Sequence, residues 1–429
     1  MAVVGILVIC LSSSLCLYFL LALIRVLHTL WWTPIRIQYQ MGSQGIKGPS
    51  YRLFNGSTKE ILNLKKEAMS RPLGLSHDIL SKAQPHIHSW INKYGKNYLQ
   101  WYGPQPQIVI TEPELIKEIL NNRDSTYPKE EVKRYVKKLL GDGLVTSEGE
   151  KWAKMRKLAN YAFHGESLKA IDIRSDFQDS FWEQLLGREE HFSDDDEIGF
   201  DNIEKFLYTQ VSWHQDANAS QKISVQDMVD ECKTFYFAGQ ETTNSLLAWT
   251  VFLLAIHTDW QEEARKEVLN LFGHQNPNPD GITKLKTMSM IINESLRLYP
   301  PVLAIIRKAE REVRLGKLTL PAEVLLFIPN IALHHDPQIW GEDVHLFKPE
   351  RFSEGVAKAT KNNMPAFLPF GMGPRNCVGF NFATTEAKIT LSMILQRYAF
   401  TLSPAYVHSP FQLLTLRPQH GVQVLLHSL

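Results

Sequence analysis

The sequence is poor in cysteine and has no excess of either charge. Cysteine occurs four times in 429 residues, at Cys10, Cys16, Cys232 and Cys377. No CxxC pair or Cys/His cluster is present, so neither a disulfide framework nor a zinc site is indicated, and a reducing environment is favoured. Lysine plus arginine number 46 against 45 for aspartate plus glutamate. Because this balance leaves no basic footprint, no nucleic-acid partner is expected.

Charge is also missing from the start of the chain. Residues 2–24 are uncharged and mostly Val, Ile, Leu, Phe and Cys, and about 20 such residues cross a bilayer. A cleaved secretory signal is the alternative, but the run is too long, and no small-x-small site follows it. Arg25, Arg36 and Lys47 follow the run and no positive residue precedes it, which predicts a luminal N-terminus and a cytosolic body. We therefore expect a transmembrane anchor at 1–25, a basic, Pro/Gly-containing linker at 26–49 and a folded body at 50–429.

The body is predicted to be mainly α with small β-sheets (α+β). Capping residues and Pro or Gly stops bound its helices, and short β-prone runs between turns indicate strands. The expected strands are 98–102 and 107–110, with more between 302 and 328; the expected helices are one opening with a capping box at Thr111–Glu114, then 152–163, 258–273, about 283–300 and about 382–398.

The strongest predicted helix runs from Ser224 to about Ile256. Asp227 is its capping partner, and 33 residues at 1.5 Å each make about 50 Å. A second membrane span is the alternative, but polar residues at 240–244 interrupt the apolar part, and the apolar stretch after them is too short. A helix crossing the middle of a large domain is therefore expected.

One cysteine stands in an unusual loop. Cys377 ends the glycine-rich stretch Phe-Gly-Met-Gly-Pro-Arg-Asn-Cys-Val-Gly, residues 370–379, just ahead of a predicted helix. The N–H groups and partial positive charge of a helix N-terminus favour a thiolate. Gly373 and Gly379 let the backbone approach a flat group, and Arg375 offers a cation for a carboxylate. A buried cysteine beside a turn is the alternative; the resemblance described next, with five fixed positions matched, argues against it.

This stretch resembles the haem-binding signature F-x-x-G-x-R-x-C-x-G of the cytochrome P450 family, and it matches at every fixed position, including Phe370 and Gly379. The resemblance implies the cytochrome P450 fold. It also implies that the cofactor is haem b and that Cys377 is the thiolate ligand of its iron.

A second motif lies midway along the long predicted helix. Residues 238–243, Ala-Gly-Gln-Glu-Thr-Thr, resemble the family's oxygen-activation sequence. By that resemblance Glu241 and Thr242 are catalytic, an acid and a hydroxyl that pass protons to dioxygen. Taken alone, the motif would be interpreted as a polar interruption packed against a neighbouring element.

Two more motifs appear in the family's order. Glu294 and Arg297 match E-x-x-R, and Arg351 lies in the Pro-Glu-Arg-Phe element. As a lone pair the first two would be an ordinary surface ion pair; the resemblance implies a buried structural network of all three.

Further cofactor-binding residues are expected from the resemblance. Trp152 and Arg156 match the W-x-x-x-R element and would hold a haem propionate. Arg307 occupies the position of another propionate-binding arginine by spacing alone.

The resemblance extends along the whole chain and implies a function. We expect a haem-thiolate monooxygenase that inserts one atom of O2 into a lipophilic, terpenoid- or steroid-like substrate. Electrons would come from NADPH through NADPH–cytochrome P450 reductase. The chain would be a single-pass protein of the endoplasmic reticulum membrane with its body facing the cytosol. The hinge at 44–49 and the sequence Leu-His-His-Asp at 333–336 resemble the plant clan that oxidises brassinosteroids, gibberellins and triterpenoids.

The sequence departs from the family between Phe163 and Ser224. Only 60 residues intervene, enough for three or four short helices, where the family has about five that include its substrate lid. Residues 165–222 are therefore interpreted as shortened. The alternative function is a haem-binding family member that is catalytically impaired or non-functional. A same-fold isomerase that rearranges peroxides without O2 is a third alternative, and intact Glu241 and Thr242 argue against it.

Overall fold

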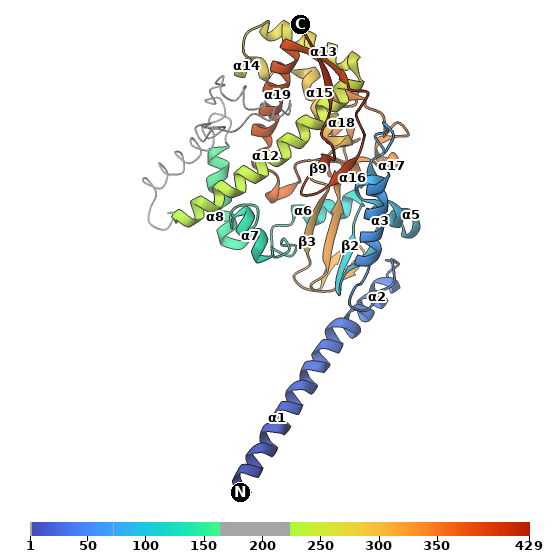
Figure 1. Ribbon diagram of the computed structural model, residues 1–429, viewed down its shortest axis with the longest axis vertical. Coiled ribbons are helices and arrows are strands. Elements are labelled where there is room, and N and C mark those ends of the chain that lie inside the picture. The colour runs from blue at the N-terminus through green and yellow to red at the C-terminus, as the bar shows by residue number, and fades with distance from the viewer. Residues whose placement is uncertain (1, 72, 164–223) are drawn as a thin grey trace. The chain divides into compact units, whose positions relative to one another are not determined.

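The computed structural model describes residues 2–71, 73–163 and 224–429, and the chain divides into two compact units. Unit 1 is Met1–Glu130 with Ala304–Leu333, and unit 2 is Glu131–Leu303 with His334–Leu429. Helices dominate, and the described strands form one four-stranded and three two-stranded sheets (Figure 1). The predicted fold class is therefore confirmed. The predicted shortening at 165–222 lies outside the described residues.

The N-terminal part of unit 1 is one continuous helical run. Helix α1 (Ala2–Leu27) passes through a π-helical turn (His28–Trp32) into α2 (Thr33–Ser43). Its apolar part is unburied and long enough to cross a membrane, which is consistent with the anchor expected at 1–25. The segment 26–49, expected as a linker, is thus helical up to Ser43.

Hydrogen bonds fasten the end of this run to unit 1. Pro34 has no N–H to offer the carbonyl of Leu30 four residues earlier, and the Tyr51 hydroxyl donates to that carbonyl at 2.6 Å. The Gln44 side-chain amide donates to the Thr319 carbonyl at 3.0 Å and accepts from the Thr319 N–H at 2.6 Å. The anchor therefore joins the body through defined contacts.

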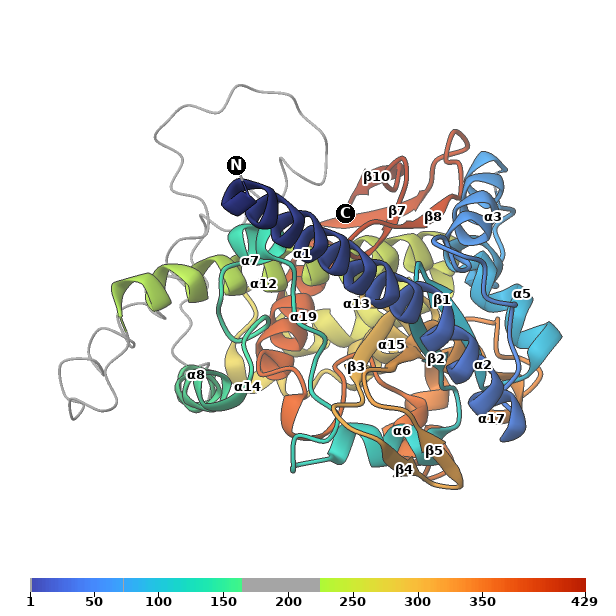
Figure 2. The same ribbon diagram turned by 90° about the horizontal axis from the view of Figure 1, so that it is seen from below.

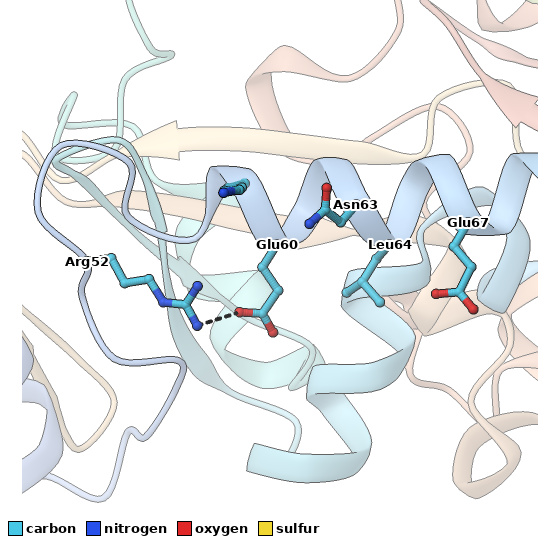
Figure 3. A pocket seen from close by; sticks show the side chains of 6 residues that line it. Arg52, Glu60, Asn63, Leu64 and Glu67 are labelled. Atoms are coloured by element: carbon cyan, nitrogen blue, oxygen red, sulfur yellow. Dashed lines mark ion pairs between the residues drawn. The ribbon is translucent and has the colours of Figure 1, made fainter.

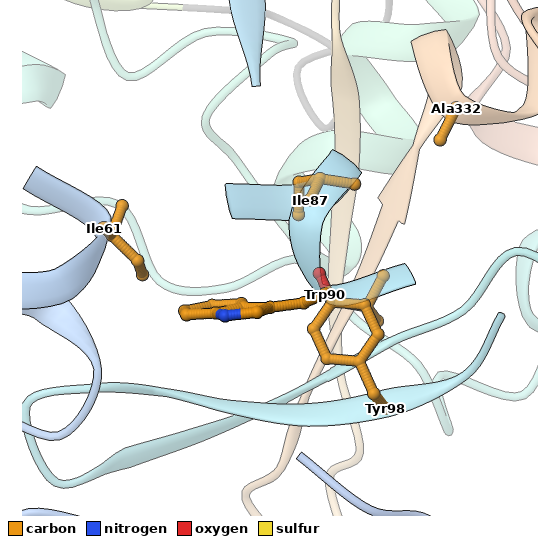
Figure 4. Close-up of a cluster of buried hydrophobic side chains, with 6 residues drawn as sticks. Ile61, Ile87, Trp90, Tyr98 and Ala332 are labelled. Atoms are coloured by element: carbon orange, nitrogen blue, oxygen red, sulfur yellow. The ribbon is translucent and has the colours of Figure 1, made fainter. Parts of the chain in front are cut away.

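The rest of unit 1 is a mixed sheet with helices beside it. Strand order is β1-β2-β6-β3, in which β2 and β6 are parallel and the other pairs antiparallel. Trp90 and Tyr98 lie at the centre of an apolar cluster with Ile61, Ile87 and Ala332 (Figure 4). The elements are α3 (Thr58–Ser70), α4 (Leu80–Ala83), α5 (Pro85–Tyr94), β1 (Tyr98–Tyr102), β2 (Gln105–Val109), α6 (Pro113–Asn121), β3 (Ala304–Lys308), β4 (Val313–Leu315), β5 (Leu318–Leu320), β6 (Leu325–Pro329) and the start of α16 (Asn330–His334).

Unit 2 is built around α12 (Val225–Ile256), the helix predicted from Ser224. Its capping box is confirmed, because Ser224 and Asp227 each bond the other's backbone N–H. Helices α15 and α19 pack against it (Figures 1 and 2). The other elements are α7 (Arg134–Leu140), α8 (Gly149–Ala162), α13 (Thr258–Phe272), α14 (Pro279–Ile282), α15 (Lys286–Leu298), α17 (Pro337–Trp340), α18 (Val356–Ala359), α19 (Phe380–Arg397), β7 (Tyr398–Leu402), β8 (Pro410–Gln412), β9 (Leu416–Pro418) and β10 (Val424–Ser428).

One predicted cap is wrong. The expected capping box at Thr111–Glu114 is absent, because α6 begins at Pro113 after Glu112 without a side-chain cap. The Thr111 hydroxyl donates to the Lys96 carbonyl at 2.7 Å instead. The proline in the first turn is present as expected.

Candidate functional site: the loop of Cys377 and helix α12

The backbone of the glycine-rich loop aims Cys377 at the start of α19. Gly371 and Gly373 have φ of 70° and 74°, a region that side chains disfavour. A 3₁₀ turn covers Gly373–Arg375, and the Cys377 N–H donates to the Phe370 carbonyl at 2.8 Å. The Phe370 ring meets the Phe380 ring edge-on, 4.8 Å between centroids, which ties the loop to the helix.

Cys377 is an exposed residue, but the surrounding protein removes water from around its thiol. Burial raises the pKa of its thiol, while the Gly379 N–H and Arg156 act in the opposite direction. The expectation that the helix N-terminus alone would favour a thiolate is therefore not met, because desolvation is the larger effect. A bound metal ion would deprotonate the thiol outright.

Arg375 is only partly satisfied. Its guanidinium lies 4.1 Å from the centre of the Trp152 ring, and Nη2 forms an ion pair with Glu148. Nη1 is buried and has no hydrogen-bond partner among the described residues. The pair shows that this guanidinium accepts a carboxylate, and a second donor is still available.

Arg156 braces the cysteine loop. Its Nη1 donates to the Asn376 carbonyl at 2.5 Å and its Nη2 to the Asn376 side-chain oxygen at 2.7 Å. Its Nε donates to the Asn160 side chain at 2.9 Å. Trp152 and Arg156 thus both reach this loop, and all three guanidinium nitrogens of Arg156 bond protein. The sequence did not mark Glu148 or Asn376, although Asn376 lies between Arg375 and Cys377 and Glu148 is four residues before Trp152.

The floor of the site is apolar. Trp152 and Val378 pack with a buried cluster that includes Met155 and Leu158 of α8. A Cβ added at Gly379 would be in ordinary van der Waals contact with the Cys377 sulfur and with the Phe163 ring, at 3.9 Å from each.

Helix α12 carries the predicted catalytic pair. The Thr242 hydroxyl donates to the Ala238 carbonyl at 2.6 Å, while the Glu241 carboxylate forms an ion pair with Arg417 of β9. The two side chains are thus held by different partners. A Cβ added at Gly239 would meet nothing within 4 Å, so this turn of the helix leaves room beside it.

A carboxyl group that sequence reasoning missed lies near α12. The pKa of Glu386, on α19, is raised to about 7, because burial outweighs the opposite effect of the Thr243 hydroxyl. Glu386 stands nine residues after Cys377, but no motif in the sequence marked it as a site residue.

The predicted structural network lies together in unit 2. Glu294 and Arg297 are fully buried and paired through two bonds of 2.7 Å. Nε of Arg351 lies 3.7 Å from the same carboxylate. Arg297 also donates to the carbonyls of His334, Val344 and Leu346.

Unit 1 contributes one predicted residue and one surface depression. Arg307 lies on β3, largely buried, and its Nη1 donates to the Ile306 carbonyl at 2.8 Å; its role toward a propionate stays a prediction. A shallow depression along α3 contains none of the predicted site residues (Figure 3). It is lined by Arg52, Lys59, Glu60, Asn63, Leu64 and Glu67.

Cys377 just ahead of α19 and Arg375, whose Nη1 has no partner among the described residues, together form a candidate ligand-binding site. The profile of the cytochrome P450 family matches residues 74–190 and 169–426. The chain belongs to the cytochrome P450 family and is a plant-type monooxygenase, an oxidoreductase that uses haem and O2.

Its relatives are plant proteins. The chain is 48% identical to cytochrome P450 CYP749A22 of Panax ginseng, over 98% of this chain and 97% of that one. It is 37% identical to 11-oxo-beta-amyrin 30-oxidase of Glycyrrhiza uralensis (94% and 95%) and 35% identical to 7-deoxyloganic acid hydroxylase of Catharanthus roseus (94% and 96%). Since the first alignment spans 507 positions, more than the 429 residues of this chain, the chain is internally shortened.

The residues present fit a haem. Cys377 would supply the sulfur ligand, and Nη1 of Arg375, which has no hydrogen-bond partner among the described residues, would suit a propionate. Such an orphaned buried donor costs free energy until an acceptor arrives.

Proposed function

We propose that this chain hydroxylates or oxidises a lipophilic, terpenoid- or steroid-like substrate, with electrons from NADPH through NADPH–cytochrome P450 reductase. The observation that carries the proposal is the loop of Cys377, in which an exposed cysteine follows Arg375 by two residues and Nη1 of Arg375 is buried with no partner among the described residues. The named activities of the relatives on a triterpenoid and on an iridoid-type acid support the substrate class.

Each site residue has a proposed role. Cys377 ligates the iron, Arg375 binds a propionate with Trp152 against its guanidinium, and Arg156 holds the loop through Asn376. When bound, the haem supplies the activation of O2. Glu241 and Thr242 carry protons toward it.

The proposed location is the endoplasmic reticulum membrane, with α1 as a single span and the body in the cytosol. The unburied apolar helix supports this placement, as does the positive charge that comes after the run in the sequence. Of the three lysines on α8 that could face an acidic reductase, Lys151 is already paired with Asp142 and Asp227, at 3.1 and 3.0 Å.

A carbon-monoxide difference spectrum of the reduced full-length protein tests the proposal. We expect a thiolate-type Soret band in the wild type, loss of that band in Cys377→Ser, and its retention in Cys232→Ser, a half-buried cysteine of α12. A wild type without the band would contradict the proposal. Turnover is then tested with NADPH, a plant reductase, 11-oxo-β-amyrin and 7-deoxyloganic acid.

A second candidate is a haem-binding protein with impaired turnover. The observation that favours it is the shortened chain, whose family match is in two pieces that meet at 169–190. A correct spectrum combined with no NADPH-dependent product from a broad triterpenoid and iridoid panel would favour this candidate.

A further inference from the structure

The β8–β9 hairpin is fastened to helix α12. The Leu416 carbonyl accepts from the Ser245 hydroxyl at 2.6 Å and from the Trp249 indole N–H at 3.0 Å. The Leu416 N–H donates to the Pro301 carbonyl at 3.0 Å, and the Leu416 side chain is fully buried. Both backbone groups of this residue are therefore bonded, so the start of β9 has a fixed position on the helix.

This attachment brings the next residue of the hairpin to Glu241. Glu241, Ser245 and Trp249 are spaced by four residues and share one face of α12. Arg417 comes directly after Leu416, so its backbone is held where Leu416 is bonded to that face. From there its Nη2 reaches the Glu241 carboxylate, and its Nε donates to the Thr415 hydroxyl at 3.3 Å.

The ion pair between Arg417 and Glu241 contributes little to stability, and its main effect is on the orientation of the Glu241 carboxylate. The Arg417 and Glu241 side chains are 37% and 23% exposed, and partly exposed ion pairs contribute little to folding. A bidentate-capable guanidinium does fix the direction of a carboxylate. The neighbouring Thr242 hydroxyl donates to the Ala238 carbonyl and not to Glu241. The orientation of the Glu241 carboxylate is therefore set by its ion pair with Arg417.

We propose that Arg417 is a positioning residue that holds the Glu241 carboxylate for proton delivery from α12. This inference rests on the proposed function of Glu241. Two outcomes compete when NADPH reduces O2 without substrate. Reduction of O2 to hydrogen peroxide consumes two electrons and two protons, and reduction of O2 to two molecules of water consumes four of each. Timely protons favour breaking of the O–O bond and formation of water, so the peroxide-to-water ratio reports proton supply.

The test measures that ratio in the full-length protein reconstituted with NADPH and a plant reductase. Arg417→Gln and Glu241→Gln should each raise the peroxide-to-water ratio by about tenfold, which is below the roughly 10²–10⁴-fold that a general acid contributes to a rate because water can also deliver protons. The double variant should equal either single one, because Arg417 acts through Glu241. Arg417→Lys should stay within about twofold of the wild type. Arg314→Gln, an exposed arginine on the β4 strand of unit 1, is the matched control and should change nothing.

Two measurements distinguish a loss of proton delivery from a loss of haem binding or of folding. The carbon-monoxide spectrum reports bound haem, and urea unfolding followed by tryptophan fluorescence reports folding; we expect both to be unchanged in Arg417→Gln. If that variant loses haem, Thr415→Val takes its place, since it keeps the charge and removes the oxygen that accepts from Nε. We expect it to raise the ratio about twofold, and an unchanged ratio would overturn the proposal.

The failures are distinguishable. If Glu241→Gln raises the ratio and Arg417→Gln does not, the positioning role is wrong and the proposed function stands. If the two changes add in the double variant, Arg417 acts elsewhere and the inference is overturned. If Glu241→Gln leaves the ratio unchanged with an intact spectrum, the proton-delivery role of Glu241 fails, and the positioning role fails with it.

Discussion

Two arginine–carboxylate pairs in unit 2 differ in how completely the chain satisfies them. Arg297 is fully buried, and its three nitrogens donate to Glu294 and to three backbone carbonyls. Arg375 lies half-buried against Trp152, pairs with Glu148 through one nitrogen and leaves buried Nη1 without a partner among the described residues. The first pair is complete in the protein alone, whereas the second has a donor left for a ligand.

This difference separates a structural site from a binding site. A buried charge with every donor used stabilises one packing and has nothing left to offer. An orphaned buried donor is costly, and a bound carboxylate repays that cost. For any buried arginine of the chain, the number of guanidinium donors that lack a partner therefore predicts whether its substitution affects folding or the affinity for a ligand.

The largest effect is expected when the complete pair is broken. Arg297→Met would leave Glu294 buried without its cation, which should lower the free energy of unfolding by about 3–5 kcal/mol. Urea unfolding of the holoprotein measures this loss. Lys266→Met is the matched control, because Lys266 pairs with Glu263 at the same spacing but on the surface, and we expect no measurable change. Equal losses of stability in the two variants would contradict the conclusion that the buried pair stabilises the fold and the exposed pair does not.

A partly buried carboxyl that has no ion pair among the described residues, that of Glu386, should behave in the opposite way. The pKa of Glu386 is raised from 4.5 to about 7, so between these pH values the unfolded chain ionises first and stability falls as pH rises. Glu386→Gln removes this penalty and should stabilise the protein at pH 8 by at most about 3 kcal/mol. The measurement is the pH dependence of urea unfolding from pH 4.5 to 8.

The exposed Glu354 serves as the control for this pH dependence. Glu354→Gln should leave the slope between pH 4.5 and 7 unchanged, since its side chain is 69% exposed. A wild-type slope that survives in Glu386→Gln would show that another group causes it.

The incomplete pair should affect affinity more than folding. Arg375→Gln removes the donor proposed for a propionate, and a hydrogen bond to a charged group contributes about 1.5–3 kcal/mol. Haem dissociation should therefore be about 10- to 100-fold faster, measured by haem transfer to apomyoglobin, with little change in unfolding. Lys358→Gln on α18 is an exposed control. A loss of folding similar to that of Arg297→Met would erase the distinction between the two pairs.

The smallest effect is expected at a neutral bond of unit 1. Tyr51→Phe removes the hydroxyl that donates to the Leu30 carbonyl, at a cost of about 1 kcal/mol. Faster hydrogen exchange in α2 would report the loosened anchor. Tyr39→Phe changes a side chain that is 80% exposed and should leave exchange unchanged; equal exchange in both variants would contradict a role for the Tyr51 bond.

Much of the fold could be predicted because its signals are local. The capping residues Ser224 and Asp227 predict the start of α12, and Pro113 predicts the first turn of α6. The capping box at Thr111 failed because the Thr111 hydroxyl found a carbonyl outside the helix. Capping residues compete for nearby backbone groups, and their order in the chain does not decide the winner.

The glycine-rich loop of Cys377, the order of the motifs and the apolar N-terminal run can be recognised in the sequence alone, because each depends on residue types at short, fixed spacings. The partner of each charged group follows only from the folded structure. Glu148 meets Arg375 across 227 residues, Arg156 meets Asn376 across 220 and Glu241 meets Arg417 across 176. Such contacts depend on how helices and hairpins pack, and packing leaves no periodic trace in the chain. The same packing partly desolvates the exposed Cys377 and raises the pKa of its thiol, against the local expectation from the helix N-terminus.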